Sequence, residues 1–463
     1  MSLARLSPLD ASFLEIESPQ AHMHVGWAAV LEPPEGRAAP SFEQMRDHIS
    51  RRLCRAPRYR QRLAPVPLGL VRPAWVDDDR FEIDRHVLYS GSGDLRALTD
   101  TVMSSPLSRE RPLWELWITE LPEGRLGMVG KVHHCMVDGI AAVELASLLL
   151  DPAPEPAAEP RRDWQPAAPP GPAQLLLDGL LSRAGEELEL LASSTRTALS
   201  PGRLRGAGRS AERAVRALAH SLAPTEPVQA LNAPLSPYRR LAFAGRPFKD
   251  LSRIKRAFRT TVNDVVLAVA AGAVRGFLAA RGERPQRLKT MVPVNVRDAS
   301  GNGELGNQIT FMFLDLPCDE PDPLRRLEDI HAATERLKSS GEAEGAEAVM
   351  NLVGYAPNPI QRALSHMLAS PRTFNLVVSN IPGPREPMYF LGCRLRESYP
   401  VVPLADRHAL SIGFTTVADG AFFGVYADRE TLPDVDGLAE AIHESTDELV
   451  GLSRRPRRVL SEA

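Results

Sequence analysis

Cysteine is rare in this chain, and its few copies are never close together. The four cysteines among 463 residues, Cys54, Cys135, Cys318 and Cys393, form no CxxC pair. This spacing argues against a disulfide framework and against a cysteine-ligated zinc site. We therefore expect a reducing compartment.

The chain also lacks a dominant charge. Its 55 lysines and arginines nearly balance its 58 aspartates and glutamates, which leaves a formal net charge of -3. Basic residues are interspersed with acidic ones, so the chain as a whole does not attract nucleic acid. We do not expect nucleic acid as a partner.

Long apolar runs are missing as well. The stretch "LAVAAGAVRGFLAA" is interrupted by Arg275 well before the roughly 20 apolar residues of a membrane span. The first residues, "MSLARLSPLDASFLEIE", lack the apolar core of a signal peptide. These absences predict a cytoplasmic protein, and they leave open a peripheral attachment to the inner membrane surface or to a lipid droplet.

The length of the chain predicts two domains, because 463 residues exceed what one hydrophobic core usually holds. A stretch rich in proline, alanine and charge, "DPAPEPAAEPRRDWQPAAPPGP", has no periodicity and is typical of an exposed linker. We expect an N-terminal domain at residues 1–150, a proline-rich linker with crossover helices at 151–235, and a C-terminal domain at 236–463.

Strand and helix patterns alternate irregularly in both halves, which indicates layered α/β domains. Residues 113–134 predict a β-hairpin that turns at "PEG" and ends on His133 and His134. Because neighbouring strand residues face opposite sides, the two histidines should point in opposite directions. Helices are also expected near 139–150, 173–199, 203–222, 261–282, 321–338 and 433–452, strands at 287–297, 308–317 and 373–381, and a second hairpin at 409–428.

The segment "KVHHCMVDGIAAVEL" concentrates polar chemistry between a strand and a helix. An imidazole at the strand end, such as that of His134, can take a proton from a hydroxyl and return it near neutral pH. Asp138 is suited to cap the following helix and to hold the turn, while Gly139 lets that helix begin without a side chain. A single histidine here can also be an ordinary core residue, and a metal site would need a third ligand that the motif does not supply.

His133 to Gly139 match the HHxxxDG signature of the acyltransferase superfamily that includes chloramphenicol acetyltransferase and the condensation domains of nonribosomal peptide synthesis. Further stretches agree: "PLWE", "NDVVLA", "SNIPGP", and the N-terminal "LSPLDASFLEIE" and "MHVG". Together they resemble the bacterial wax ester synthase/acyl-CoA:diacylglycerol acyltransferase family over essentially the whole chain. The region after Asp151 matches nothing in that pattern.

This resemblance implies an α/β fold of two chloramphenicol-acetyltransferase-like domains with a substrate tunnel at their interface. The implied substrates are acyl-CoA and a fatty alcohol or a diacylglycerol, without a cofactor and without a metal. His134 would be the general base for direct attack of the acceptor hydroxyl on the thioester, and would then protonate the leaving CoA thiolate. His133 would support it, and Asp138 with Gly139 would orient the turn.

Two pairs of polar residues are further candidates. Asn263 and Asp264 begin a predicted helix, where they either cap it or order the wall of the active site. Ser379 and Asn380 end a predicted strand, where they either donate to an oxyanion or substrate, or start a turn.

Trp114 of "PLWE" either packs in the core or contacts substrate, and core packing is the commoner role of such a tryptophan. The residues that would contact the phosphates of CoA are not assigned. Arg239, Arg240 and Arg297 are the candidates. The basic stretch 203–222 predicts either an ordinary solvated helix or one that lies on a membrane surface.

Two other functions compete with the leading one. The first is an acyltransferase of specialised metabolism that uses a carrier-bound acyl donor or a non-lipid acceptor. The second is a non-catalytic lipid-binding module. An intact His134 and Asp138 disfavour the module, because a copy without catalysis would be free to lose them.

Overall fold

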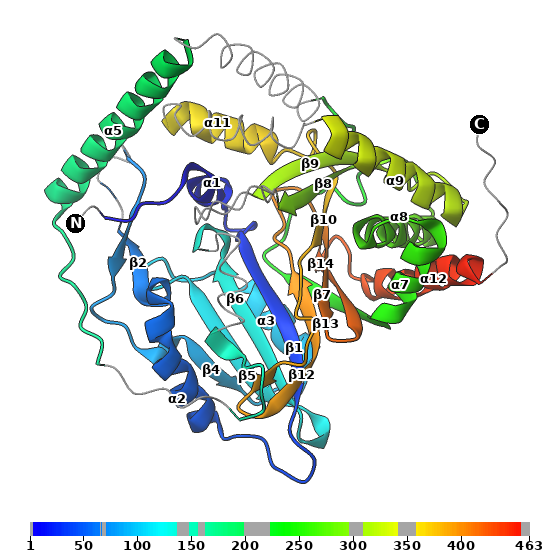
Figure 1. Ribbon diagram of the computed structural model, residues 1–463, viewed down its shortest axis with the longest axis horizontal. Coiled ribbons are helices and arrows are strands. Elements are labelled where there is room, and N and C mark those ends of the chain that lie inside the picture. Colours follow the sequence, from blue (N-terminus) through cyan, green and yellow to red (C-terminus); the bar gives the residue numbers. More distant parts are fainter. Residues whose placement is uncertain are drawn as a thin grey trace.

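The structure is a computed structural model, and it describes residues 3–64, 66, 71–136, 148–155, 163–198, 223–295, 309–340 and 358–454. Two six-stranded sheets stand side by side, one built largely from the first third of the chain and one from the last half (Figure 1). The mixed α/β architecture that the sequence predicts is confirmed.

The N-terminal sheet places the histidine-bearing strand near its centre. Its strand order is β11-β12-β1-β6-β5-β4, and all neighbours are antiparallel except β4 and β5. Every residue of β6 is buried, so this strand is a rigid base for the turn that follows it. The strands are β1 (His24–Glu32), β4 (Val87–Ser90), β5 (Trp114–Glu120), β6 (Leu126–His133), β11 (Tyr389–Phe390) and β12 (Cys393–Val401).

Strand β12 joins the two halves of the molecule. It comes late in the chain, yet it pairs antiparallel with β1, with a register shift between Val30 and Leu31. The predicted C-terminal domain at residues 236–463 therefore contributes two strands to the N-terminal sheet. The sequence did not predict β12, because its pairing partner lies more than 350 residues away.

The C-terminal sheet has the order β7-β14-β13-β10-β8-β9. Strand β10 runs parallel to both of its neighbours, and the remaining pairs are antiparallel. All of these strands except β7 overlap a segment that the sequence predicts to be extended, and β7 was not predicted as a strand. The strands are β7 (Arg239–Pro247), β8 (Leu288–Asn295), β9 (Ile309–Leu316), β10 (Leu376–Asn380), β13 (Leu410–Val417) and β14 (Gly420–Asp428).

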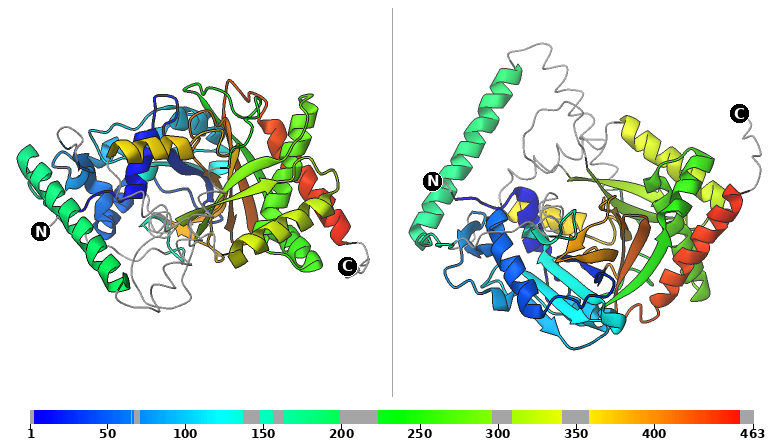
Figure 2. Two further views of the ribbon diagram at one scale, coloured as in Figure 1. Left: turned by 90° about the horizontal axis from the view of Figure 1, so that it is seen from above. Right: turned by 60° about the horizontal axis from the view of Figure 1, so that its bottom comes forward.

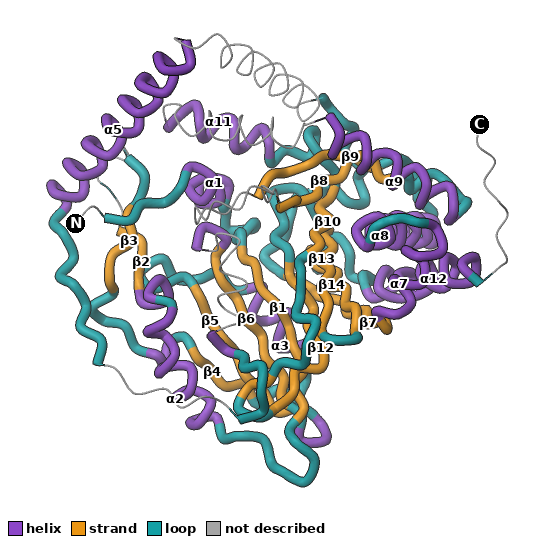
Figure 3. Tube along the Cα trace, in the orientation of Figure 1, coloured by secondary structure: helices purple, strands orange, loops and turns teal. Residues whose placement is uncertain are grey.

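Four helices cover the outer side of the C-terminal sheet (Figure 3). They are α7 (Phe248–Phe258), α8 (Val262–Ala280), α9 (Pro323–Ser340) and α12 (Asp436–Ser453). Among the described helices α8 alone is long and apolar enough to cross a membrane, and most of it is buried. It packs against α7, α9 and α12 and so forms the centre of this layer.

The remaining described elements lie around the N-terminal sheet. Helix α3 packs between that sheet and β7. Helix α11 lies against α1 (Figure 2). The helices are α1 (Pro8–Ile16), α2 (Phe42–Arg52), α3 (Leu95–Ser104), α5 (Pro172–Ala198) and α11 (Asn358–Leu368). Strands β2 (Gln61–Ala64) and β3 (Ala74–Asp77) form a separate pair. Single 3-10 turns cover Leu53–Arg55, Pro57–Arg60, Ile83–Arg85, Pro122–Gly124 and His134–Met136.

The predicted hairpin at residues 113–134 is confirmed, with Pro122–Gly124 as its turn. The predicted helix at 173–199 is confirmed as α5. The predicted helix and basic stretch at 203–222 lie outside the described residues, as does most of the one predicted at 139–150.

Candidate active site

The two histidines sit where β6 ends and a tight turn begins. His133 is the last residue of β6, and His134 opens the 3-10 turn His134–Met136. The His133 N–H donates to the Leu113 carbonyl oxygen at 2.9 Å, and the His134 N–H donates to the Met23 carbonyl oxygen at 2.9 Å. Backbone hydrogen bonds to the chain on both sides therefore fix the position of the pair.

The His134 ring lies flat against a phenylalanine. Phe13 of α1 stacks on it with ring centroids 3.6 Å apart and an interplanar angle of 20°. Burial lowers the pKa of His134 to about 4, although a contact with its own backbone carbonyl works in the opposite direction. The imidazole is therefore neutral near pH 7, the form that accepts a proton.

His133 is held by a different part of α1. Its Nδ1 accepts the Cys135 N–H at 3.1 Å, which in the neutral ring places the proton on Nε2. That Nε2 lies 3.7 Å from Oε2 of Glu17, the residue that ends α1, and Glu17 also pairs with Arg109. Burial acts to raise the pKa of Glu17, but the contacts with His133 and Arg109 together lower it below its usual value. His134 in the 3-10 turn therefore contacts Phe13 within α1, whereas His133 in β6 contacts Glu17 at the C-terminal end of that helix.

Strand β1 adds a further imidazole beside the pair. His24 is the ladder partner of His133, and the two rings meet edge to face with centroids 6.2 Å apart. His24 Nε2 accepts the Leu107 N–H at 3.4 Å, and burial, followed by the charge of Lys131, holds its pKa well below the usual value. This ring is therefore a neutral part of the packing beneath the site.

Sequence reasoning did not assign roles to Phe13, Glu17, Met23 or His24. The signal for them was the pair of stretches "LSPLDASFLEIE" and "MHVG", which counted only toward the family resemblance. Their proximity to His134 depends on the packing of α1 and β1 against the end of β6.

The structure brings two other predicted residues together. Asn380 at the end of β10 donates from Nδ2 to Oδ1 of Asn263, the second residue of α8, at 3.4 Å. Ser379, one position earlier, is buried with 8% of its surface exposed. A primary amide carries two N–H groups, so Asn380 retains a donor after this hydrogen bond.

Asp264 serves the attachment of helices. Its carboxylate accepts hydrogen bonds from the Thr261 N–H at 2.9 Å and the Thr334 hydroxyl at 2.7 Å, and it lies 2.9 Å from His331 Nδ1. Burial acts to raise its pKa, but these hydrogen bonds lower it overall. Asp264 therefore caps α8 and ties it to α9, which fixes the neighbouring Asn263.

Trp114 lies in the core of the N-terminal sheet. Its side chain is 4% exposed, its Nε1 donates to the Tyr59 carbonyl oxygen at 2.8 Å, and its ring stacks on His86 with centroids 4.7 Å apart. These contacts engage the polar atom and a ring face of Trp114, as expected of a packing residue.

Two arginines considered for CoA phosphates are engaged elsewhere. Arg239 is buried in an ion pair with Asp428, and Arg240 pairs with Asp436. The remaining candidate, Arg297, lies outside the described residues, and so do Asp138 and Gly139. Within the part of the chain that the structure describes, no group of three or more His, Cys, Asp or Glu side chains has the arrangement of a metal site.

Family models match both halves of the chain. Residues 6–266 match the wax ester synthase/diacylglycerol acyltransferase catalytic domain, and residues 305–450 match the WS/DGAT C-terminal domain. A putative diacylglycerol O-acyltransferase from Mycobacterium bovis is 34% identical and covers 97% of this chain and 96% of that protein. A probable diacylglycerol O-acyltransferase from Mycobacterium tuberculosis has the same identity and coverage.

Solved structures agree in fold. The wax ester synthase/diacylglycerol acyltransferase from Marinobacter aquaeolei superposes with a TM-score of 0.69 at 26% identity, and covers 97% of this chain and 99% of its own. The starter condensation domain of a rhizomide synthetase superposes with a TM-score of 0.59 at 14% identity, over 98% of this chain and 95% of that one. This second likeness concerns the fold alone.

Proposed function

The chain belongs to the wax ester synthase/diacylglycerol acyltransferase family, and from this premise we propose that it moves a long-chain acyl group from acyl-CoA to the hydroxyl of a hydrophobic alcohol or a diacylglycerol. It is an O-acyltransferase of wax ester or triacylglycerol synthesis. The observation that carries the proposed mechanism is the neutral His134 ring, stacked on Phe13 and fixed through its backbone to Met23.

In this mechanism His134 takes the proton of the acceptor hydroxyl as that oxygen attacks the thioester carbonyl carbon. The tetrahedral intermediate then collapses, the carbon–sulfur bond breaks, and the imidazolium returns the proton to the CoA thiolate. The imidazolium form is disfavoured by burial, so it releases its proton readily.

The oxyanion needs hydrogen-bond donors, and we assign this role to the end of β10. Asn380 has an N–H group left after its bond to Asn263, and Ser379 contributes a buried hydroxyl. Asn263 and Asp264 order this wall. From the sequence we expect Asp138 and Gly139, which lie outside the described residues, to orient the turn at His134. Trp114 supports the site from the core. The mechanism uses side chains alone, so we expect turnover to need neither a metal nor a cofactor.

We further propose that the protein works in the cytoplasm and attaches peripherally to a membrane or lipid droplet, where such acceptors collect. Leu177, Leu180 and Leu181 of α5 support this, because between 48% and 62% of each residue is exposed. Exposed leucines on one helix are suited to contact an apolar surface.

The test is release of free CoA thiol from palmitoyl-CoA by purified protein, with hexadecanol, a diacylglycerol or a polar alcohol as acceptor. We expect turnover with a lipid acceptor in the presence of a chelator, and its loss in His134→Ala. His443→Ala on α12, outside the site, is the matched histidine control and should keep wild-type turnover. The preferred acceptor separates wax ester synthesis from triacylglycerol synthesis.

Turnover that survives in His134→Ala would refute the general-base role. Turnover only with a carrier-bound acyl donor or a polar acceptor would instead place the chain in specialised metabolism. Lipid binding without turnover in either form would identify a binding module.

A further inference from the structure

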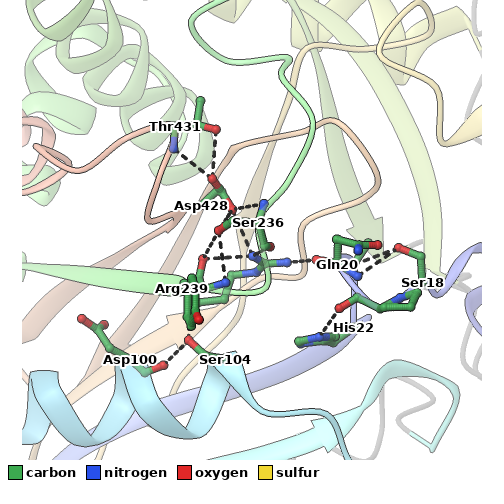
Figure 4. A network of polar contacts seen from close by, with 12 residues as sticks. Ser18, Gln20, His22, Asp100, Ser104, Ser236, Arg239, Asp428 and Thr431 are labelled. Carbon is green, nitrogen blue, oxygen red and sulfur yellow. Dashed lines mark hydrogen bonds and ion pairs between the residues drawn. The ribbon is translucent and has the colours of Figure 1, made fainter.

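A buried arginine links the C-terminal half of the molecule to the loop before β1 (Figure 4). Arg239 of β7 and its partner Asp428 of β14 have side chains that are 2% and 0% exposed. The guanidinium donates to the Ser236 carbonyl oxygen at 2.6 Å, the Tyr238 carbonyl oxygen at 3.0 Å and the Asp428 carboxylate at 3.2 Å. Its remaining arm donates to the Gln20 carbonyl oxygen in the N-terminal half.

The loop that Arg239 contacts leads directly to His134. Ser18 and Ala21 exchange backbone hydrogen bonds, and the Ser18 hydroxyl accepts the Gln20 and Ala21 N–H groups, so Gln20 sits in a closed turn. Two residues beyond this turn is Met23, whose carbonyl oxygen accepts the His134 N–H. Arg239 and His134 are therefore joined through one short and tightly bonded piece of chain.

The backbone of Met23 needs such support. Its φ of 49° lies in the left-handed region, which residues other than glycine seldom adopt. A residue keeps this conformation only where its surroundings impose it. The hydrogen bond from Arg239 to Gln20 on one side and the bond from His134 on the other are two such restraints.

We propose that Arg239 is a positioning residue for the acyl transfer: by holding the loop at residues 18–23 it keeps the Met23 carbonyl, and with it His134, in place from the C-terminal half of the molecule. This inference rests on the proposed role of His134 as the base. It makes the alignment of the base depend on the contact between the two halves.

The chemistry of the side chain makes the role testable. Arginine has five N–H donors in a planar fork, which allows one side chain to serve the Asp428 carboxylate and three carbonyl groups at once. Lysine has three donors on a single nitrogen and cannot span this set. Arg239→Lys thus retains a positive charge beside Asp428 while it removes the arm that reaches Gln20.

Ser104 offers a matched control at the same interface. Its hydroxyl accepts the backbone N–H of Arg239 at 2.8 Å, so Ser104→Ala also removes a hydrogen bond between the two halves, but not one that leads to the loop. Both variants and the wild type are compared by hydrogen exchange of peptides that contain residues 18–24 and 133–136, and by kcat and KM for palmitoyl-CoA.

We expect Arg239→Lys to speed exchange in both peptides. It should lower kcat by about 10- to 100-fold, the range for a small misplacement of a catalytic group, with KM unchanged. Ser104→Ala should change neither peptide nor kcat. A folded Arg239→Lys protein whose exchange and kcat match those of Ser104→Ala would overturn the proposal.

A second variant covers the case in which Arg239→Lys does not fold. Arg239→Gln combined with Asp428→Asn removes both charges together and so avoids an unpaired buried carboxylate. We expect this double variant to show the same faster exchange and lower kcat. Values that match those of Ser104→Ala would overturn the proposal. Hydrogen exchange requires no turnover, so failure of the proposed function, seen in His134→Ala, stays distinguishable from failure of this inference.

Discussion

At the scale of single residues, the site depends on the environment of one imidazole. His134 is neutral because burial lowers its pKa to about 4, and Phe13 supplies one flat side of that burial. The titratable groups facing this region include His133, the last residue of β6, and Glu17, the C-cap of α1, whose side chains lie 3.7 Å apart. Phe13 is thus the side chain through which the protonation of His134 can be altered with the least disturbance to these groups.

Replacing Phe13 by leucine should shift the pH dependence of turnover. A base works only when unprotonated, so wild-type kcat/KM is expected to fall as the pH drops through about 4. Phe13→Leu lets water reach the ring and raises the pKa of His134 toward its usual value, which moves this fall to higher pH. Activity at pH 5 should decline more than activity at pH 8.

At pH 8 the ring is unprotonated in both proteins, so kcat/KM there should change little. Phe81→Leu is the control, because Phe81 stacks on His86 with centroids 5.1 Å apart at 15°, away from the site. An unchanged acid limb in Phe13→Leu would show that Phe13 does not determine the protonation of His134.

At the scale of elements, β12 is the strand that couples the two sheets. It pairs with β1 of the N-terminal sheet and crosses close to β14 of the C-terminal sheet. A Cβ built on Gly424 of β14 would lie 2.0 Å from the Pro400 carbonyl oxygen of β12. Glycine is required here because the backbones of β14 and β12 touch. Neither strand can move away without losing the hydrogen bonds to its own neighbours in the sheet.

Gly424→Ala should therefore lower the free energy of unfolding by about 1–3 kcal/mol, the usual cost of overpacking a core. Urea unfolding measures the change. Gly451→Ala on α12 is the control, since nothing lies within 4 Å of a Cβ there. It should be neutral or stabilising, because alanine favours a helix over glycine by up to about 1 kcal/mol. Equal effects of the two changes would contradict the close approach.

At the scale of the whole molecule, the two halves meet through partly buried polar groups between α3 and β7. Asp100 of α3 accepts the Leu241 N–H at 2.9 Å, and burial raises the pKa of this carboxyl to about 6. A carboxyl with a raised pKa binds its proton more tightly in the folded state. Its contribution to stability is present at low pH and is lost as the pH rises from about 4 to about 6.

Asp100→Asn should consequently stabilise the protein at pH 7.5 and leave its stability at pH 4 unchanged. The expected gain is about 1 kcal/mol, a figure reduced for the water that reaches this half-buried group. Asp79→Asn, in an exposed turn, is the control and should give the same difference from wild type at both pH values. A loss of stability at pH 7.5 in Asp100→Asn would show that the charge is favourable there, and urea unfolding decides the sign.

Local patterns in the sequence were sufficient for many elements. Two extended runs around "PEG" predicted the hairpin that carries His133, and the long apolar stretch after Asp264, interrupted once by Arg275, predicted α8. These signals are read within a single element, so no tertiary contact is needed to interpret them. The family likewise followed from motifs that are contiguous in the chain, and the same motifs led to the proposal that His134 is the general base.

Only the folded chain decided which distant residues surround those motifs. Phe13 reaches His134, Asn263 meets Asn380, and Arg239 holds the turn at Gln20, across separations of 117 to 219 residues. Such contacts arise from the packing of whole sheets and helices, and no period in the sequence encodes them. The sequence determined the chemistry available and the elements that carry it, whereas the tertiary structure decided which groups bury, orient and restrain the base.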